Sequence, residues 1–359
     1  MNSSKAKTPG ISGGQAACAV LIYRIFTLMT FVPLITEGCS FTVQTAAAAA
    51  SAVIQCVLII PAVILSKKQH GIFSMPNFAK TAVYTVYWVY FTAVSAGAVI
   101  RFSRFMDCRF GERLHPALLA LMLSAVCTYC ACCGIEGTVR AAAVILIFFA
   151  AMAVSVLIGS VGEMSAENIS KDFSAELFLR GTLEETARSS ELTMLCYLNK
   201  FTSSDYGKNA FRAIAGKFAV TVAVTSAVLL ALGDYAYISS YPFLDLGSAA
   251  GVRFLQRIDA VYMMLWTITA VISLSAQIYL AGDCVSSVTG CGRTAGNLIS
   301  SAAVTAAAGI LIYKKVNADG FFRAVSSLPA QIVTAALIPL MTLIVLNIRS
   351  KRKEHPVYT

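Results

Sequence analysis

The feature that most constrains this chain is the recurrence of apolar stretches long enough to cross a bilayer. A helix of about 20 apolar residues spans roughly 30 Å of hydrocarbon, because each residue adds about 1.5 Å. Such stretches are predicted at residues 13–34, 41–66, 79–100, 116–133, 139–161, 211–233, 258–281, 297–313 and 329–348. Only 13% of the 359 residues are charged and 57% are hydrophobic, whereas a soluble domain needs more charge to cover its surface. The sequence therefore predicts an all-α polytopic membrane protein.

A tenth stretch, residues 181–198, is predicted to cross the membrane although it carries charges. Its flanks differ in net charge, which is −2 over residues 162–180 and +3 over residues 199–217. Because lysine and arginine gather on the cytoplasmic side, these flanks are expected on opposite sides of the bilayer. Ten crossings also place both basic chain ends in the cytoplasm. Residues 101–115 and 314–323 oppose this scheme, because each carries a net charge of +2 and falls outside.

Two of the ten predicted spans, the first and the sixth, are interrupted by charged residues, accompanied in the first by proline and glycine. These residues are Arg24, Pro33, Glu37 and Gly38 in the first span and Glu184, Glu185, Arg188 and Glu191 in the sixth. A charge at the bilayer centre costs roughly 2.5–3.5 kcal/mol on insertion scales, so such residues usually face the interior and mark functional sites. With five spans per half, the two spans correspond in position. That pattern is typical of inverted-repeat transporters, in which discontinuous helices 1 and 6 form a site at the midplane.

Three other functional classes are weighed against this prediction. The net charge of +10 reflects basic residues near the two ends of the chain, so nucleic-acid binding is not expected. The CTYCACC motif at residues 127–133 is interpreted as helix packing, because its spacing fits no zinc site with a second ligand pair. EETAR at residues 184–188 is one residue short of an intramembrane-protease motif, and His70, His115 and His355 lie in predicted loops or tails. We expect no enzyme activity, no cofactor and no metal ion.

Four ordered segments resemble the endospore germination permeases, which are the B subunits of nutrient germinant receptors. The segments are GISGGQ (10–15), CGIEGTVRAAAVI (133–145), GTLEETARSSELTMLCYLNKF (181–201) and YPFLDLGSAAGVRFLQRIDAVYMMLWTITAVISLSAQIY (241–279). The last segment includes Arg257, Asp259, Trp266 and Tyr279, which match the family pattern of an Arg-x-acidic helix start followed by Trp and Tyr. The sixth span lacks the family's proline, but serine hydroxyls can bend a helix by competing for backbone carbonyls.

The resemblance implies a branch of the amino acid–polyamine–organocation superfamily with the leucine-transporter-like five-plus-five fold. The expected organisation is one transmembrane domain over residues 1–359, with ten transmembrane helices, broken helices 1 and 6, and repeats at about 11–161 and 181–348. The implied role is to sense a small nutrient germinant, in the first place an amino acid, during spore germination. The implied partners are an A-type subunit and a lipoprotein C-type subunit in the inner spore membrane, with both termini cytoplasmic. The alternative is a secondary amino acid transporter of the same superfamily.

In this fold, helices 1, 3, 6 and 8 surround the ligand. The expected ligand-binding residues are Arg24, Thr27, Arg188, Ser189, Ser190, Glu191, Trp266 and Thr269. Serine hydroxyls and freed N–H groups at the break in helix 6 could bind a carboxylate, as could the fork of an arginine. Glu191 could receive an amino group or a proton. The alternative for Glu191 and for both arginines is a structural ion pair within the bundle.

Two further groups of side chains leave alternatives open. Aromatic residues Tyr84, Tyr87, Trp88 and Phe91 share one face of the predicted third helix. That face fits either an aromatic wall of the site or an interfacial belt, and the belt is the preferred interpretation. The hydroxyl and amide residues of helix 8 are Thr267, Thr269, Ser273, Ser275 and Gln277. Most of them are interpreted as packing between helices.

Overall fold

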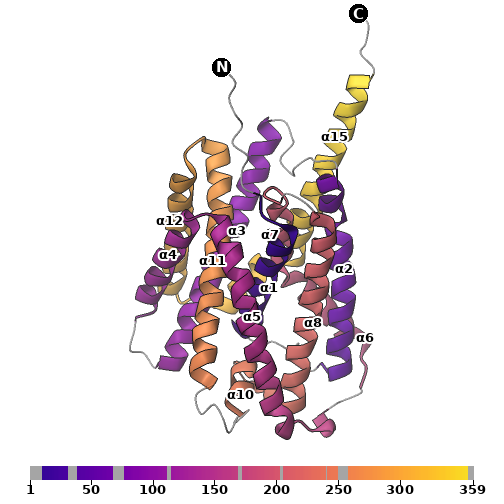
Figure 1. The fold of residues 1–359 in the computed structure, drawn as a ribbon, viewed down its shortest axis with the longest axis vertical. Coiled ribbons are helices and arrows are strands. Elements are labelled where there is room, and N and C mark those ends of the chain that lie inside the picture. Colours follow the sequence, from indigo (N-terminus) through magenta and orange to yellow (C-terminus); the bar gives the residue numbers. More distant parts are fainter. Residues whose placement is uncertain are drawn as a thin grey trace, which may run out of the picture.

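The computed structural model is helical throughout the parts of the chain that it describes. These parts are residues 10–30, 39–67, 77–110, 115–168, 172–202, 205–239, 241–249 and 258–354. Within them no β-strand forms, and a single β-bridge joins Ile11 to Thr202. The long helices run side by side as a bundle, with α10 at its lower end in the view of Figure 1.

The long helices follow the predicted apolar stretches closely. They are α1 (Gly13–Thr30), α2 (Phe41–Lys67), α3 (Asn77–Phe110), α4 (Pro116–Cys132), α5 (Ile135–Ser160), α8 (Tyr206–Leu232), α11 (Ile258–Thr289), α12 (Arg293–Tyr313) and α15 (Ile338–Glu354). The shorter helices are α6 (Ala175–Ala187), α7 (Ser190–Leu198), α9 (Tyr235–Ile238), α10 (Pro242–Ala249), α13 (Ala318–Val325) and α14 (Leu328–Gln331). The 3₁₀-helices η1 (Val161–Glu163) and η2 (Ala166–Asn168) and the π-helix η3 (Ile332–Leu337) complete the series.

Eight of the described helical segments are long and apolar enough to cross a membrane. Two predicted spans lie outside this set, because α4 is shorter and the span at 181–198 is divided between α6 and α7. The count of ten crossings therefore stays a prediction, whereas an all-helical, multi-pass membrane architecture is established.

The outer surface of the bundle carries many large apolar side chains. Ile147, Phe148 and Ile158 of α5 are exposed, as are Leu121 and Met122 of α4. By contrast, many serine, threonine, glutamine and charged side chains are buried between the helices. Apolar side chains facing outward and polar groups facing one another are the arrangement that hydrocarbon favours.

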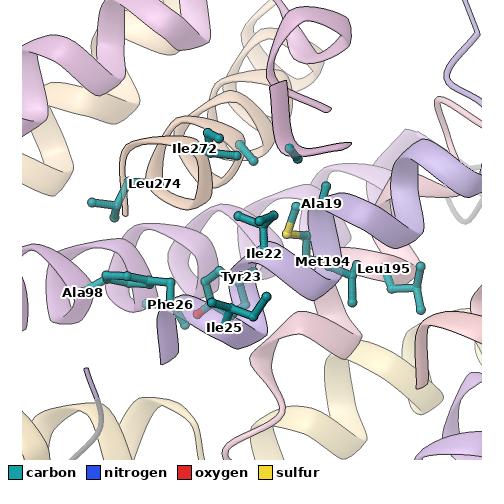
Figure 2. Close-up of a cluster of buried hydrophobic side chains, with 14 of the residues drawn as sticks. Ala19, Ile22, Tyr23, Ile25, Phe26, Ala98, Met194, Leu195, Ile272 and Leu274 are labelled. Atoms are coloured by element: carbon teal, nitrogen blue, oxygen red, sulfur yellow. The ribbon is translucent and has the colours of Figure 1, made fainter. Parts of the chain in front are cut away.

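Helix α1 lies at the centre of the bundle and contacts α5, α8 and α11 (Figure 1). Its apolar side chains meet residues from three other helices in the core. The residues labelled in Figure 2 are Ala19, Ile22, Tyr23, Ile25 and Phe26 of α1, Ala98 of α3, Met194 and Leu195 of α7, and Ile272 and Leu274 of α11. This central position means that a polar group on α1 is placed inside the bundle and away from lipid.

The predicted break in the sixth span is confirmed, between α6 and α7. Arg188 caps the end of α6, and Ser189 leaves the helical conformation with φ −85° and ψ 51°. The Ser189 hydroxyl donates a hydrogen bond of 2.7 Å to the Glu185 carbonyl, and such side-chain bonds favour helix ends and bends. Helix α1 is continuous over Gly13–Thr30. The predicted disruption at residues 33–38 lies outside the described residues.

Two charges that the topology argument assigned to loops lie inside the bundle. Arg101 belongs to α3, is buried, and places its guanidinium 4.1 Å from the centre of the Phe322 ring. Lys217 belongs to α8 and is also buried. Counting both as loop charges was wrong, because charged residues that are buried and partnered report packing and not membrane orientation. Without Lys217 the net charge of residues 199–217 falls from +3 to +2, and without Arg101 that of the opposing segment 101–115 falls from +2 to +1.

The preferred belt interpretation of the aromatic residues on α3 is also wrong for most of them. Tyr84, Tyr87 and Phe91 are buried, while Trp88 is half-buried and donates a hydrogen bond to Ser300 at 3.2 Å. Tyr87 and Phe91 pack edge-on against Tyr197 of α7, with ring centroids 5.2 and 5.5 Å away. These side chains form an internal wall because the face of α3 that carries them is turned toward α7.

Candidate functional site

The break between α6 and α7 brings two glutamates together inside the bundle. Glu185 lies in the last turn of α6, and Glu191 lies in the first turn of α7. Arg24 of α1 pairs with both, at 2.5 Å to Glu185 Oε1 and 3.8 Å to Glu191 Oε1. All three side chains are buried. The alternative of a structural ion pair is therefore realised for Arg24, and the pairing joins α1 to both halves of the broken helix.

Lys217 completes this cluster and was missed in the sequence. Its Nζ atom lies 2.8 Å from Glu191 Oε1 and 3.6 Å from Glu185 Oε1. It also donates hydrogen bonds to Gln55 Oε1 at 2.9 Å and to the Ser189 hydroxyl. The sequence did contain a signal, because Lys217 lies inside the span predicted at residues 211–233. A charge inside a span requires a partner within the bundle. We name Arg24, Glu185, Glu191 and Lys217 the ion cluster.

Neutral polar side chains extend the ion cluster into α2 and α8. Arg24 Nε donates to the Thr221 hydroxyl at 3.1 Å, and Gln55 donates to the Ser51 hydroxyl at 2.8 Å. Ser51 also accepts a hydrogen bond of 2.9 Å from Thr186. Buried charges are tolerable only when hydrogen bonds replace the lost hydration. The neutral side chains around the ion cluster supply several of these hydrogen bonds.

The two serines predicted to bind a carboxylate are both engaged within the protein. Ser189 accepts from Lys217 and donates to a backbone carbonyl of α6. The Ser190 hydroxyl lies 2.7 Å from the Tyr23 hydroxyl of α1. Both residues therefore lie at the predicted place, beside the ion cluster. A ligand that used either hydroxyl would have to share it or to displace a protein partner.

Arg188 lies at the break but pairs away from the ion cluster. Its guanidinium contacts Glu184 Oε2 at 2.7 Å, and Glu184 Oε1 also accepts from Arg180 at 3.1 Å. These are contacts between neighbouring turns of a single helix end. A ligand role for Arg188 stays a prediction, and the structure supplies a local ion pair for it.

Trp266, another predicted residue, lies in a second, apolar cluster. Trp266 stacks on Phe102 with ring centroids 4.8 Å apart and packs against Phe105 at 4.1 Å. Its Nε1 donates to the Thr30 hydroxyl at 3.0 Å. We name Phe26, Phe102, Phe105 and Trp266 the aromatic cluster.

Two threonines predicted to bind the ligand bond to their own helices. Thr27 donates to the Arg24 carbonyl and Thr269 to the Trp266 carbonyl, at 2.8 and 2.7 Å. Two other hydroxyls of α11, those of Thr267 and Ser275, likewise donate to carbonyls one turn earlier. Such bonds satisfy the hydroxyl locally. The bonds of Thr267, Thr269 and Ser275 lie within α11, which is helix 8 of the ten-helix prediction, and do not join it to another helix. Gln277 does join two helices, because it accepts a hydrogen bond of 2.9 Å from Ser95 of α3.

A polar network beside the ion cluster links α3, α7 and the C-terminal helices. Gln331 donates to the Tyr90 hydroxyl at 2.7 Å and accepts from Thr193 at 3.1 Å. Tyr87 donates to the Thr334 carbonyl at 2.6 Å, within the π-helical turn η3. π-Helical turns are uncommon and occur often at functional sites. The network therefore adds the α3 face and η3 to the surroundings of α7.

The electrostatic balance of the ion cluster defines what it can accept. Two cations face two carboxylates, so the cluster is neutral when all four are ionised. Glu191 is 1% exposed, and within the described residues neither of its carboxylate oxygens has a hydrogen-bond donor, although Oε1 lies 2.8 Å from Lys217 Nζ. A buried carboxylate oxygen normally accepts a hydrogen bond. Glu191 Oε2 can therefore receive one more donor, such as an ammonium group.

Comparisons with known proteins agree with this architecture. A family profile described as a spore germination protein matches residues 81–317. A Na⁺-coupled sialic acid symporter, solved in a substrate-bound outward-open state, is 10% identical over 93% of this chain and 89% of its own, with a TM-score of 0.59. Mhp1, a nucleobase-cation-symport-1 family transporter solved closed with bromovinylhydantoin, is 14% identical over 100% and 97%, with a TM-score of 0.52. A comparison with curated proteins finds no significant match. At these identities the structural likeness shows the fold alone, which is the leucine-transporter-like fold.

Proposed function

Because the chain belongs to the spore germination protein family, we propose that it is the integral membrane subunit of a spore germinant receptor. Its family and fold make it a permease-like membrane protein. In this proposal it binds a small nutrient germinant at the α6–α7 break and works with an A-type subunit and a lipoprotein C-type subunit. The proposed location is the inner spore membrane, with both termini in the cytoplasm.

The observation that carries the ligand proposal is the carboxylate of Glu191. Its Oε1 atom lies 2.8 Å from Lys217 Nζ as an ion pair, but within the described residues neither carboxylate oxygen accepts a hydrogen bond of normal geometry. An ammonium group that reaches Oε2 would complete the hydrogen bonding of a buried carboxylate. The ligand's own carboxylate would then face Arg24, which already spans α1 and both half-helices.

A zwitterion suits this site better than an ion of one sign. The ion cluster is already balanced, and an added net charge in a low-dielectric interior is expensive. An amino acid brings equal and opposite charges, so the balance is kept. The proposed ligand is therefore a small amino acid, as the resemblance to the germination permeases also implies.

The test is a thermal-shift screen of the purified protein against amino acids, nucleosides and sugars. We expect at least one amino acid to raise the melting temperature, because a ligand at 100 times its Kd adds about 2.7 kcal/mol of stability. Glu191→Gln should weaken that ligand by about 10- to 100-fold, since a hydrogen bond to a charged group contributes about 1.5–3 kcal/mol.

The matched control is Glu176→Gln, which changes an exposed carboxylate in the first turn of α6. This variant should bind the ligand like the unmodified protein. An amino acid that binds Glu191→Gln and the unmodified protein equally well would remove Glu191 from the site. Stabilisation by sugars or nucleosides alone would contradict the amino acid proposal.

A second candidate function, secondary transport of an amino acid, is favoured by the fold neighbours. Both are named as symporters or transporters. Uptake of a radiolabelled amino acid, chosen from the thermal-shift hits, into proteoliposomes separates the two functions. Concentrative uptake driven by an ion gradient, without other subunits, would favour the transporter. Binding without uptake, together with co-purification of A-type and C-type subunits, would favour the receptor.

A further inference from the structure

The ammonium of Lys217 sits in a pocket of oxygen atoms at the helix break. The side chain is 4% exposed and lies in the middle of α8. Gln55 Oε1 is 2.9 Å from Nζ, Glu191 Oε1 is 2.8 Å away, and the Ser189 hydroxyl accepts a hydrogen bond. Glu185 Oε1 follows at 3.6 Å. Three helical segments, α2, α6 and α7, and the Ser189 link thus contribute an oxygen each to one positive charge.

The chemistry of this pocket is that of a small-cation site. Amide, hydroxyl and carboxylate oxygens are the ligands that hard cations take. A lysine ammonium has three N–H donors, and here three oxygen atoms lie within hydrogen-bonding reach of it. The carbonyl end of α6 adds its partial negative charge on the same side. The pocket therefore surrounds a single positive charge, which is the ammonium group of Lys217 on α8.

We propose that the Lys217 ammonium is a tethered cation that fills a monovalent-cation site at the α6–α7 break. In the unmodified chain the site then takes no free cation, because the Lys217 ammonium already occupies the space between these oxygens and supplies the positive charge. Shortening Lys217 leaves two carboxylates, Glu185 and Glu191, facing Arg24 alone. The truncated site should accept a free monovalent cation, such as Na⁺ or methylammonium, which restores both the charge and the oxygen contacts.

The experiment compares the melting temperature of the full-length protein and of Lys217→Ala in detergent, at constant ionic strength and without nutrient. Choline chloride is the reference salt because its cation is too bulky for a lysine-sized gap, and it is replaced stepwise by sodium, potassium or methylammonium chloride. We expect Lys217→Ala to melt lower in choline. Its melting temperature should then rise with each tenfold increase of at least one small cation. The unmodified protein should melt at the same temperature in all four salts.

Lys208→Ala is the matched control, because Lys208 is an exposed lysine on the same helix. It should show no difference among the salts. If Lys217→Ala yields no folded protein, Lys217→Gln takes its place, since glutamine keeps most of the packing and offers an amide oxygen to the cation. A folded Lys217 variant that melts alike in choline and in every small cation overturns the proposal. Selective stabilisation of the unmodified protein by Na⁺ over choline overturns it as well. Neither result depends on whether a nutrient binds.

Discussion

The ion cluster and the aromatic cluster lie along the same central helix but are held together by opposite chemistry. Arg24 belongs to the first, and Thr30, which accepts from Trp266, borders the second. Arg24 and Thr30 are six positions apart, which corresponds to about 9 Å along a helix. One cluster pairs charges across a helix break, whereas the other stacks rings between continuous helices. The sequence prediction had placed Arg24 and Glu191 of the first and Trp266 of the second in a single ligand site.

The difference shows where this fold concentrates its sensitivity to change. In the ion cluster each charge is satisfied by particular partners, so removal of one leaves another buried and uncompensated. In the aromatic cluster the stabilisation comes from contact area, so a somewhat smaller ring keeps most of it. The break in the sixth span is therefore coupled to α1, α2 and α8 by directional contacts. The ring contacts mainly fill space.

The largest effect is expected from Arg24→Met, which keeps the aliphatic length and removes the charge. We predict a loss of about 3–5 kcal/mol of unfolding free energy, because Glu185 loses its 2.5 Å partner inside the bundle. Chemical denaturation in detergent, followed by tryptophan fluorescence, measures the change. If the comparison between clusters is correct, no single ring replacement in the aromatic cluster will cost as much.

A double variant sharpens this prediction. Arg24→Met combined with Glu185→Gln removes one charge of each sign, so the pair should be less destabilised than the sum of the two single variants. Such coupling between contacting residues typically amounts to about 0.5–3 kcal/mol. Strict additivity would show that Arg24 and Glu185 do not stabilise each other. It would contradict the claim that the ion cluster depends on specific charge pairs.

The second effect is expected from Trp266→Phe in the aromatic cluster. The smaller ring can still stack on Phe102, but it leaves a gap and removes the hydrogen bond to the Thr30 hydroxyl. We predict a loss of about 1–2 kcal/mol. The thermal shift caused by the amino acid ligand should be retained, since this cluster lies apart from Glu191. Loss of ligand binding without loss of stability would show that Trp266 belongs to the ligand site and that the two clusters form one site.

Much of the fold could be predicted from the sequence because hydrocarbon imposes simple rules on a chain. Apolar length located the helices, and charges in residues 181–198 located the break, which the structure places at Ser189. Residue types also identified Arg24 and Glu191 as internal. These predictions rest on the cost of placing charge in an apolar medium, which is large enough to dominate local propensities.

The composition of the site was less predictable, because it depends on how helices face one another. The sequence does not distinguish Lys217 from a lysine that flanks a span, because only the orientation of α8 turns it toward the α6–α7 break. The sequence likewise does not show that Phe102 and Phe105 pack around Trp266. The belt interpretation of Tyr87 failed for the same reason. Periodicity showed which side chains share a face of α3, but it could not show that α7 covers that face.

The smallest effect is expected at an ion pair beyond the end of α7. Lys200, in the turn that follows this helix, pairs with Asp283 of α11 and also donates to the Tyr84 hydroxyl at 3.2 Å. Burial of the lysine opposes its charged form, but Asp283 and Tyr84 outweigh that and raise the pKa of Lys200. The Lys200 side chain remains 26% exposed, so solvent screens the pair. We predict that Asp283→Asn costs about 1 kcal/mol near neutral pH, at the upper end for such pairs.

The pH dependence distinguishes this pair from the ion cluster. A raised lysine pKa contributes stability that is fully present below the unfolded value and is lost as the pH rises through the folded value. The difference in unfolding free energy between the unmodified protein and Asp283→Asn should therefore shrink at alkaline pH, above the ordinary lysine range. Denaturation curves of both proteins at several pH values give this difference directly, with global alkaline effects cancelling between them. A difference that stays constant would mean that Asp283 stabilises through its 2.7 Å bond from the Tyr197 hydroxyl and not through Lys200.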